Sequence, residues 1–565
     1  MRPAAAPAMP PDPFGSSKRR RLGVLTRGSL GKGVEAKIDA GRPVESVRAG
    51  TFCVVEGERL DFFALITDLE IDAANEGILL HPPRPDEHLL RRVLQASGTH
   101  ATATLRPQLV LQQDEPDARP QTVKTIPGHF ALVGEATEDD VARVFGSEAD
   151  ASGDFFEVGT PVGMDSVPVC LDLARFVERS NAVFGKTGTG KSFLTRLLLA
   201  GAMKASRGVA LVFDMHGEYG HGKASEEGAF APGLSDVFGA GVQIFTLDPA
   251  QMRQRGKRFD AELALYADQI EPGDILPLQK TLDLNRTASE SADLMRRRYK
   301  TRWLATLLDA DTPRLEEIAD EIGANVNSLQ ALRRKLSRFT KYGFFHTEPM
   351  AGREDRIEQV FEALDRGRSV VIEFGRHKSR EVYLLFANVL ARRLRQKYEE
   401  KVNKYEASER PEDKPRQLLV VVEEAHHFLS PEVAGETPFG KIAREMRKFY
   451  VSLLIVDQRP SGIDEEVLSQ IGTKFVAQLS DEKDLAAALV GTPGAAGLRQ
   501  ILASLDSKQQ ALLLGHAVPM PITISTRTWD QELARAFREE AGVVRLDGSV
   551  DEAHAQSESL FGTSA

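Results

Sequence analysis

With 565 residues, the chain is longer than one hydrophobic core usually supports, and we expect two or three domains. Hydrophobic residues make up 42% of the chain and charged residues 27%, which excludes a wholly disordered protein and a fibrous repeat. The net charge of −10 excludes a surface uniformly coated with positive charge. It does not exclude a nucleic-acid partner, because phosphates respond to the local field and a ring can carry basic residues along an inner channel.

The cysteine content and the hydropathy pattern indicate a cytoplasmic protein. Cys53 and Cys170 lie far apart and have no CxxC partner, so neither a disulfide framework nor a cysteine-rich zinc site is expected. No apolar run approaches the ~20 residues needed to span a bilayer, and the first residues lack the apolar segment of a secretory signal. We therefore expect no membrane partner.

The amino-terminal part of the chain is predicted to be a leader followed by a barrel. Residues 1–21 are rich in Pro and end in the basic run 18–21, which we interpret as the solvated end of a disordered tail rather than an address or a nucleic-acid contact. Between residues 22 and 146, short β-type runs such as 51–55 and 62–66 are separated by Gly, Pro and Asp turns. This spacing predicts a small antiparallel β-barrel.

From residue 147 to about 535, apolar strands alternate with amphipathic helices, which predicts an α/β domain with a mostly parallel sheet. Between about 251 and 350 the strands give way to helical patterns rich in Arg and Lys, which we interpret as a helical insertion. Residues 536–565 are expected to form a tail. The predicted strands are 181–184, 209–213, 369–372, 418–422, 453–456 and 474–479.

Within the insertion, residues 315–336 have the apolar spacing and the central Gly323 of a helix-turn-helix. A DNA-reading helix is one interpretation of this segment. Two packed helices with a glycine turn and a solvated basic face are the other, and it is the interpretation we favour from sequence. The basic residues concerned are Arg333, Arg334, Lys335 and Arg338.

A phosphate-binding loop is predicted between the strand at 181–184 and the helical run that follows residue 192. Such a loop needs small residues so that backbone N–H groups turn inward, a Lys that reaches the β- and γ-phosphates, and a Ser or Thr hydroxyl for Mg²⁺. The helix N-terminus adds its dipole to the anion site. The sequence therefore predicts binding of ATP and Mg²⁺ by Gly185, Lys186, Thr187, Gly188, Thr189, Gly190, Lys191, Ser192 and Phe193.

An apolar strand at 418–422 is followed by two carboxylates, Glu423 and Glu424. Beside a phosphate loop, such a strand end typically holds the hydrated Mg²⁺ and polarises the attacking water. We assign Glu423, together with Ser192, to the metal and Glu424 to the general base. A strand that ends in two glutamates is by itself usually a solvated strand end, and the phosphate loop earlier in the chain favours the functional interpretation.

Further polar residues follow other strands of the predicted sheet, at the edge where ligands of parallel sheets bind. Asp214 and Glu218 follow the strand next to the loop, and Gln458 follows the strand at 453–456, where it is predicted to sense the γ-phosphate. His426 and His427 are predicted to be packing and hydrogen-bond partners, because no third metal ligand lies close to them in the sequence.

Together these motifs resemble the HerA branch of the HerA/FtsK family of hexameric DNA-pumping ATPases. The resemblance rests on GKTGTGKS at 185–192, DMHGEY at 214–219, VVVEEAHHF at 420–428, REMRKF at 444–449 and VDQRPSGIDEEVLSQ at 456–470. It covers most of the chain, since residues 22–146 resemble that family's amino-terminal barrel and 515–525 its closing strands. It implies a RecA-like ATPase domain.

The resemblance also implies residue roles. Asp214 and Glu218 would support the water and the metal, and either Arg444 or Arg447 would be the arginine finger that enters a neighbouring subunit's site, with Arg447 as our first choice. The alternative for both arginines is a surface charge on an amphipathic helix. Where relatives usually carry a Gly in this stretch, the chain has Met446, a departure that bears on the geometry of the finger.

Two functions are compatible with this family. The first is a homo-hexameric ring that moves duplex DNA and feeds a NurA-type nuclease in the resection of double-strand breaks. The second is an ATPase ring that serves as an assembly platform and activates a bound effector in antiviral defence. An inactive nucleotide-binding scaffold is disfavoured, because Lys191, Ser192, Glu423 and Glu424 are all present.

Overall fold

The computed structural model describes residues 19–540, except 74–79, 81, 85, 95–98, 116–117, 119, 165–166, 225–229, 436, 493–494 and 507–508. Of the leader predicted at 1–21 and the tail predicted at 536–565, residues 1–18 and 541–565 lie outside the described residues, whereas residues 536–540 are helical. The chain forms two compact units. The first comprises residues 1–150, 159–171 and 518–525, and the second comprises 151–158, 172–517 and 526–565. The domain boundaries expected from sequence stay predictions.

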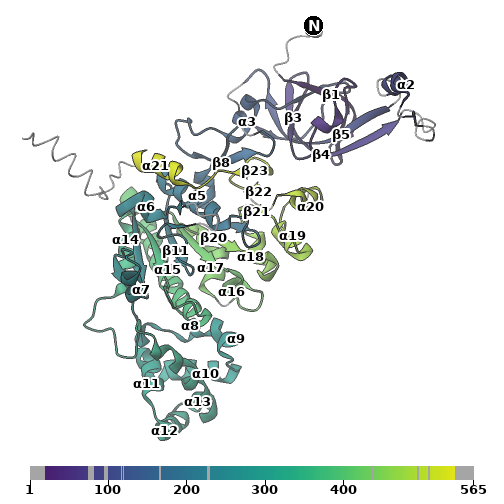
Figure 1. The fold of residues 1–565 in the computed structure, drawn as a ribbon. Helices are drawn as coiled ribbons and strands as arrows, with labels where there is room; N and C mark the ends of the chain where they lie inside the picture. The colour runs from purple at the N-terminus through teal and green to yellow at the C-terminus, as the bar shows by residue number, and fades with distance from the viewer. Residues whose placement is uncertain are drawn as a thin grey trace, which may run out of the picture. The chain divides into compact units, whose positions relative to one another are not determined.

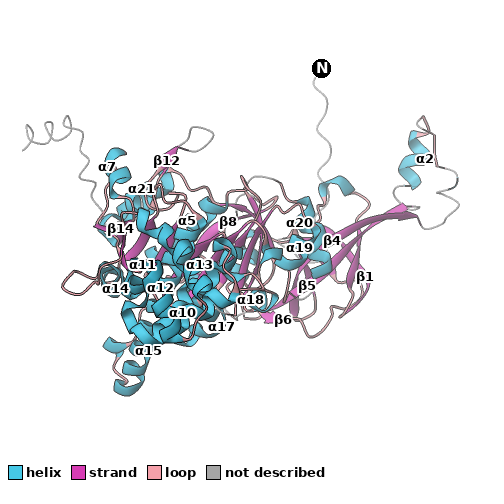
Figure 2. Ribbon diagram, turned by 90° about the horizontal axis from the view of Figure 1, so that it is seen from below, coloured by secondary structure: helices cyan, strands magenta, loops and turns pink. Residues whose placement is uncertain are grey.

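The first unit contains a closed antiparallel β-barrel (Figure 1), as expected from sequence. Its strands follow the order β2-β1-β7-β3-β4-β5, and a further pairing of β2 with β5 closes the ring, while β6 adds to the free side of β5. Figure 2 shows the helix α2 (His88–Val93) at the far end of the long β4–β5 pair. The strands are β1 (Arg21–Ser29), β2 (Gly33–Ile38), β3 (Phe52–Glu56), β4 (Leu60–Ala73), β5 (Thr99–Gln112), β6 (Gln121–Thr122) and β7 (Leu132–Glu135).

The barrel closes around apolar side chains such as Cys53, Val55 and Leu105, which are fully buried. Arg19 lies just before the first strand, and our interpretation of the basic run as solvated was wrong for this residue. Its guanidinium forms ion pairs with Asp140 at 2.7 Å, Asp61 at 2.8 Å and Glu56 at 3.2 Å, and only 15% of its side chain is exposed. Such a cluster fixes the start of the barrel, because a buried carboxylate is costly without its cation.

The second unit is built on a sheet whose strands follow the order β15-β14-β18-β11-β19-β20-β10-β21-β22. All neighbouring pairs are parallel except β21 with β22. The α/β class is therefore confirmed, and each of the six predicted strands is present. The strands are β10 (Asn181–Phe184), β11 (Val209–Asp214), β14 (Val242–Thr246), β15 (Ala261–Glu262), β18 (Ser369–Glu373), β19 (Leu418–Glu423), β20 (Val451–Asp457), β21 (Thr473–Ala477) and β22 (Gln510–Gly515).

Helices connect these strands, so the central strands are buried on both faces and read as continuous apolar runs. None of the described helices has the length and apolar character needed to cross a membrane.

Strands β8 (Phe155–Pro161), β9 (Val169–Asp172) and β23 (Ile522–Thr526) lie where the chain passes between the two units. The helices are α3 (Glu138–Phe145) in the first unit, and α4 (Leu173–Glu178), α5 (Lys191–Lys204), α6 (Leu234–Phe238), α7 (Pro249–Gln254), α14 (Arg356–Asp365), α15 (Arg380–Ser408), α16 (His426–Leu429), α17 (Pro438–Glu445), α18 (Glu465–Ser469), α19 (Glu482–Ala488), α20 (Ala495–Ser504) and α21 (Gln531–Glu540) in the second.

A group of helices between β16 (Leu265–Tyr266) and β17 (Phe345–His346) corresponds to the expected insertion, and Figure 1 shows α10 to α13 together at its lower end. The parallel β16–β17 pair joins the two ends of this segment. Arg392 of α15 binds the buried Asp274 at 2.8 Å and so attaches the segment to the sheet domain. The helices are α8 (Pro272–Ile275), α9 (Gln279–Leu282), α10 (Arg286–Tyr299), α11 (Trp303–Asp309), α12 (Thr312–Ile322) and α13 (Val326–Leu336).

Candidate nucleotide site

The predicted phosphate loop lies between β10 and α5, at the carboxyl edge of the parallel sheet. Gly188 and Gly190 have φ values of 82° and 88°, a conformation that residues with a Cβ rarely adopt. A Cβ on Gly185 would lie 2.6 Å from Thr189 Oγ1 and 2.9 Å from the Cβ of Ala477, so this position also requires glycine. The loop therefore has the backbone turn that lets successive N–H groups face a bound anion.

Lys191, the first residue of α5, directs its ammonium back into this loop, where Nζ donates to the carbonyl oxygen of Lys186 at 2.9 Å. Burial lowers the pKa of Lys191, and the carboxylates of Glu424 and Asp457 act against this shift. A cation that is partly desolvated and surrounded by acidic groups is well placed to meet phosphate oxygens. The loop and its lysine therefore fit the phosphates of a nucleoside triphosphate.

The carboxyl ends of the central strands bring several carboxylates to this edge. Asp214 ends β11, Glu423 ends β19 and Asp457 ends β20. Phe184, the residue before the loop, pairs in register with Asp457, and the N–H of Gly185 donates to the Asp457 carbonyl at 3.3 Å. Because the strands are parallel and adjacent, residues more than 200 positions apart line one edge.

Glu423 is buried, and its Oε1 accepts a hydrogen bond from the Tyr219 hydroxyl at 3.0 Å. Its Oε2 is buried without a hydrogen-bond partner among the described residues. Burial raises the pKa of Glu423 well above its ordinary value, and the charge of Asp214 adds to this shift. A nearby divalent cation would favour the ionised form and give Oε2 a partner, directly or through a metal-bound water. Glu423 therefore fits the metal-side role.

Glu424 lies immediately after the strand, in the left-handed region with a φ of 47°. Such a conformation is uncommon for a residue with a Cβ and is frequent at functional sites. Gln458 connects it to the phosphate loop. The Gln458 amide donates to Glu424 Oε1 at 3.0 Å, and its carbonyl oxygen accepts from the Thr187 hydroxyl at 2.7 Å. The structure thus joins three residues that the sequence placed in one site.

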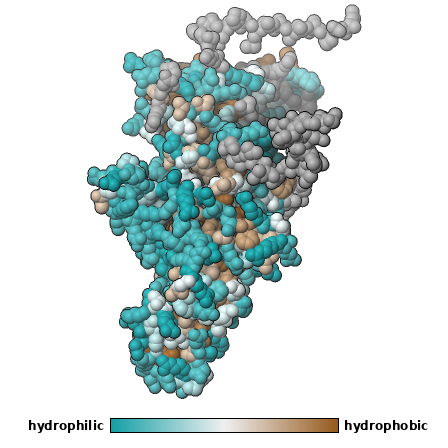
Figure 3. Space-filling view, turned by 90° about the vertical axis from the view of Figure 1, so that its left-hand side faces the viewer, coloured by the Kyte–Doolittle hydropathy of each residue, from teal (hydrophilic) through white to brown (hydrophobic). Residues whose placement is uncertain are grey.

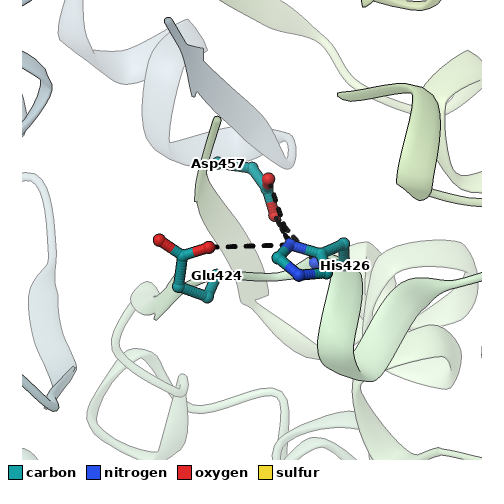
Figure 4. Close-up of side chains that lie close together, drawn as sticks. All are labelled: Glu424, His426 and Asp457. Carbon is teal, nitrogen blue, oxygen red and sulfur yellow. Dashed lines mark hydrogen bonds and ion pairs between the residues drawn. The ribbon is translucent and has the colours of Figure 1, made fainter. Parts of the chain in front are cut away.

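Figure 4 shows the His426 ring linked to both Glu424 and Asp457. Its Nδ1 is 3.0 Å from Asp457 Oδ2 and 3.7 Å from Glu424 Oε2. Burial alone would lower the pKa of His426, but the hydrogen bond and charge of Asp457 raise it. Asp457, distant in the sequence, joins Glu424 and His426 in a group whose ligand atoms lie close enough to hold a cation, and His427 is not part of this group. Asp457 also accepts the backbone N–H groups of His426 and Arg459, so the histidine retains a hydrogen-bonded, orienting role.

Asp214 has its carboxylate occupied by the loop that follows it. Oδ1 accepts the N–H of Glu218 at 2.9 Å, and Oδ2 accepts those of Tyr219 at 2.8 Å and Gly220 at 3.3 Å. The direct effect of Asp214 is therefore to hold the 214–220 turn, which in turn positions the Tyr219 hydroxyl on Glu423. The role predicted for Glu218 in supporting the water or the metal stays a prediction.

Glu373, at the end of β18, was missed by the sequence analysis. It pairs in register with Asp214, and burial together with the Asp214 charge raises the pKa of Glu373 to about 7. Its Oε1 is buried without a hydrogen-bond partner among the described residues. The signal was available, because Glu373 directly follows the predicted strand 369–372 in the way Glu423 follows 418–422.

The two arginine candidates differ in what they contact. Arg444, on α17, uses all three nitrogens of its guanidinium, since it donates to the carbonyls of Gly440 and Ala434 and to Glu466. Arg447 lies beyond the helix, in the 3₁₀ turn 446–449, with 55% of its side chain exposed and Glu178 as its ion-pair partner. Arg447 is thus the more accessible cation of the two.

The parallel sheet, the glycine-dependent phosphate loop and the acidic strand ends define a nucleotide-binding P-loop ATPase. Residues 156–394 match the family model described as "Helicase HerA, central domain". A Pyrococcus furiosus protein named DNA double-strand break repair helicase HerA is 26% identical over 69% of this chain and 72% of its own length. The Sulfolobus acidocaldarius protein of the same name is 25% identical over 87% of this chain and 90% of its own length.

The chain is thus similar to HerA-type ATPases, the family that its sequence motifs resemble. Among solved structures, the bacterial conjugative coupling protein TrwB is 14% identical, with a TM-score of 0.44 over 70% of this chain and 92% of that chain.

Proposed function

We propose that the chain is an ATP-driven motor that moves duplex DNA, assembles as a homo-hexameric ring and acts with a nuclease in the resection of double-strand breaks. The observation that carries this proposal is the link Thr187–Gln458–Glu424, which connects the phosphate loop to the candidate base in a chain similar to double-strand break repair helicases. Such a link couples the state of the nucleotide to the end of β20, and a motor needs coupling of this kind.

The chemistry follows from the positions of these side chains. The loop N–H groups and Lys191 would hold the phosphates, while Ser192 and Glu423 would hold Mg²⁺, which would neutralise charge on the transferred phosphoryl group. Glu424 would orient the attacking water and accept its proton, and the Gln458 amide keeps the Glu424 carboxylate in place. His426 is anchored to Asp457, and its ring lies beside the Glu424 carboxylate.

Replacing Glu424 tests the assignment of the base. We expect Glu424→Gln to bind ATP but to lose ATP hydrolysis by about 10²–10⁴-fold, because the amide cannot accept the proton of the attacking water. Nucleotide binding would be measured by fluorescence titration and turnover by phosphate release. Glu400→Gln, which removes the same charge from an exposed position of α15, is the control and should retain wild-type activity.

If Glu424→Gln instead lost ATP affinity outright, Glu424 would be a metal-side or structural residue, and the two glutamates would exchange roles. Because bound ATP stabilises the state that binds it, the Gln variant should also retain the assembled ring.

DNA binding tests the proposed substrate. We expect affinity for duplex DNA to fall steeply with salt, with a log–log slope of about −0.9 for each phosphate contact, and ATP hydrolysis to rise when DNA is added. Fluorescence anisotropy at several salt concentrations and a phosphate-release assay measure both. Sharp preference for one duplex sequence would indicate that the main DNA contact is the segment 315–336 and not a channel.

The nuclease partner is tested by adding the product of the neighbouring gene to the same ATPase assay. Stimulation by a nuclease supports end resection. If the rate of ATP hydrolysis does not change when DNA is added but rises when a non-nuclease effector is added, the assembly-platform function is favoured instead.

A further inference from the structure

The insertion contains a helix-turn-helix whose two helices are packed and capped as such motifs require. Gly323, with a φ of 67°, ends α12, and the Asn325 side chain caps α13 by accepting the N–H groups of Asn327 and Ser328. The inner faces are buried, since Ile318, Ala319, Leu329 and Leu332 are at most 4% exposed. The motif is therefore a rigid element and not a loosely associated pair of helices.

The outer face of α13 is polar and positively charged. Residues 323–347 contain no Asp or Glu but five Lys and Arg residues, in a chain whose net charge is −10. Asn327, Gln330 and Arg334 are spaced by three and four residues and so share one face of the helix. Arg338 follows on the 3₁₀ turn 337–341 and, like Arg334, is exposed. Among the described residues, no carboxylate is ion-paired with Arg334 or Arg338.

Several neighbouring basic residues have partners within the insertion. Arg333 donates to the carbonyl of Leu308, and Lys335 pairs with Asp283. On α10, Arg296 and Arg298 pair with Glu271 and Glu321. These cations have partners within the insertion, whereas Arg334 and Arg338 are exposed and have no ion-paired carboxylate among the described residues.

An apolar protein partner does not match this surface. None of the large hydrophobic side chains that are exposed in the described structure belongs to α10–α13. Figure 3 shows a mainly hydrophilic surface at its lower end, where Figure 1 places these helices. The first helix exposes Glu316, Glu317 and Asp320, so its own outer face disfavours a polyanion, whereas α13 carries no carboxylate.

We propose that α13 is a duplex-DNA contact separate from the nucleotide site, with Arg334 and Arg338 on backbone phosphates and Asn327 and Gln330 at base edges in the major groove. The amino-terminal residues of the second helix reach base edges in DNA-binding helix-turn-helix motifs, and the amides of Asn and Gln can pair with adenine. The proposal revises the interpretation we favoured from sequence, and it rests on duplex DNA being the substrate of the motor.

The first test compares Arg334→Ala/Arg338→Ala with Arg353→Ala/Arg366→Ala in the full chain. The control pair removes the same charge from two exposed arginines that are already paired with Glu348 and Glu362. With a 30-base-pair duplex of mixed sequence, the α13 variant should bind roughly tenfold more weakly, and its log–log salt slope should fall by about 1.8. Basal ATP hydrolysis without DNA should be unchanged in both variants.

The second test selects duplexes from a randomised pool with wild type and with Asn327→Ala/Gln330→Ala. We expect wild type to enrich adenine-containing sites roughly tenfold and the variant to lose this enrichment while keeping the salt slope. Equal enrichment by both proteins would overturn the placement of α13 in the groove.

An unchanged affinity and salt slope in Arg334→Ala/Arg338→Ala would overturn the DNA contact itself, while DNA-stimulated ATP hydrolysis by that variant would leave the proposed motor function intact. If wild type bound no duplex DNA, the α13 contact and the proposed motor function would both be overturned. If the variant lost its assembled mass before any DNA was added, the face would be a subunit contact, which also overturns the proposal.

Discussion

Lys191→Ala is expected to reduce ATP turnover by at least about 10²–10³-fold, because the ammonium group is the cation that the loop directs at developing negative charge on the transferred phosphoryl group. In the structure this ammonium is partly desolvated and lies on the Lys186 carbonyl, inside the loop. Lys191 is the residue with which the helix after the loop begins, and it is the lysine whose ammonium group is directed into the loop. The loss should therefore not be compensated from within the chain.

Phosphate release under saturating ATP measures this effect. Lys204→Ala, at the opposite end of the same helix, removes an equal charge far from the loop and should stay close to wild type. Turnover of Lys191→Ala within a few-fold of wild type would refute the assignment of the loop as the nucleotide site.

Arg447→Ala is expected to bind ATP normally and to hydrolyse it about 10³-fold or more slowly, if each site borrows this arginine from a neighbouring subunit. In a head-to-tail ring every interface is heterologous, so a residue on one face reaches the site of the next subunit. Arg447 is exposed, and Glu178 is the one ion-pair partner it has in the part of the chain that the structure describes, whereas Arg444 has its donors occupied within its own chain.

Mixing two inactive proteins tests this sharing directly. Arg447→Ala subunits keep an intact loop, and Lys191→Ala subunits keep an intact arginine, so some interfaces of a mixed ring would pair both functional groups. We expect partial recovery of hydrolysis that peaks at intermediate ratios. If mixed rings are confirmed by mass and no ratio restores activity, Arg447 acts within its own subunit or has no role in hydrolysis. Arg444→Ala carried through the same series then decides between the two arginines.

Much of the site could be predicted because its parts are local in sequence. The phosphate loop is one contiguous stretch, in which Gly188 and Gly190 have positive φ values, and it follows a short buried strand. Glu423 and Glu424 end a short apolar run, which is typical of a buried strand in a parallel sheet. Alternation of apolar residues and turns likewise predicted the closed barrel, because a small antiparallel sheet buries one face and hydrogen-bonds its own edges.

Contacts between distant segments could not be predicted, because they depend on strand order. The sequence shows no reason for His426 to meet Asp457, or for Glu373 to lie beside Asp214. Both follow from β19 adjoining β20 and from β18 adjoining β11. Arg19 is a similar case, since its local sequence is a solvated basic run and only the barrel brings Asp61 and Asp140 to it.

The amino-acid sequence by itself determined that this protein folds as a barrel and a parallel α/β sheet and that it carries a phosphate loop with an acidic strand end. Burial patterns and glycine conformations are set within a few residues, so a linear reading can recover them. Only the tertiary structure decided that Gln458 bridges Thr187 and Glu424, that Arg447 is more accessible than Arg444, and that Arg334 and Arg338 are exposed. Those properties belong to side chains from separate segments, which packing alone brings together.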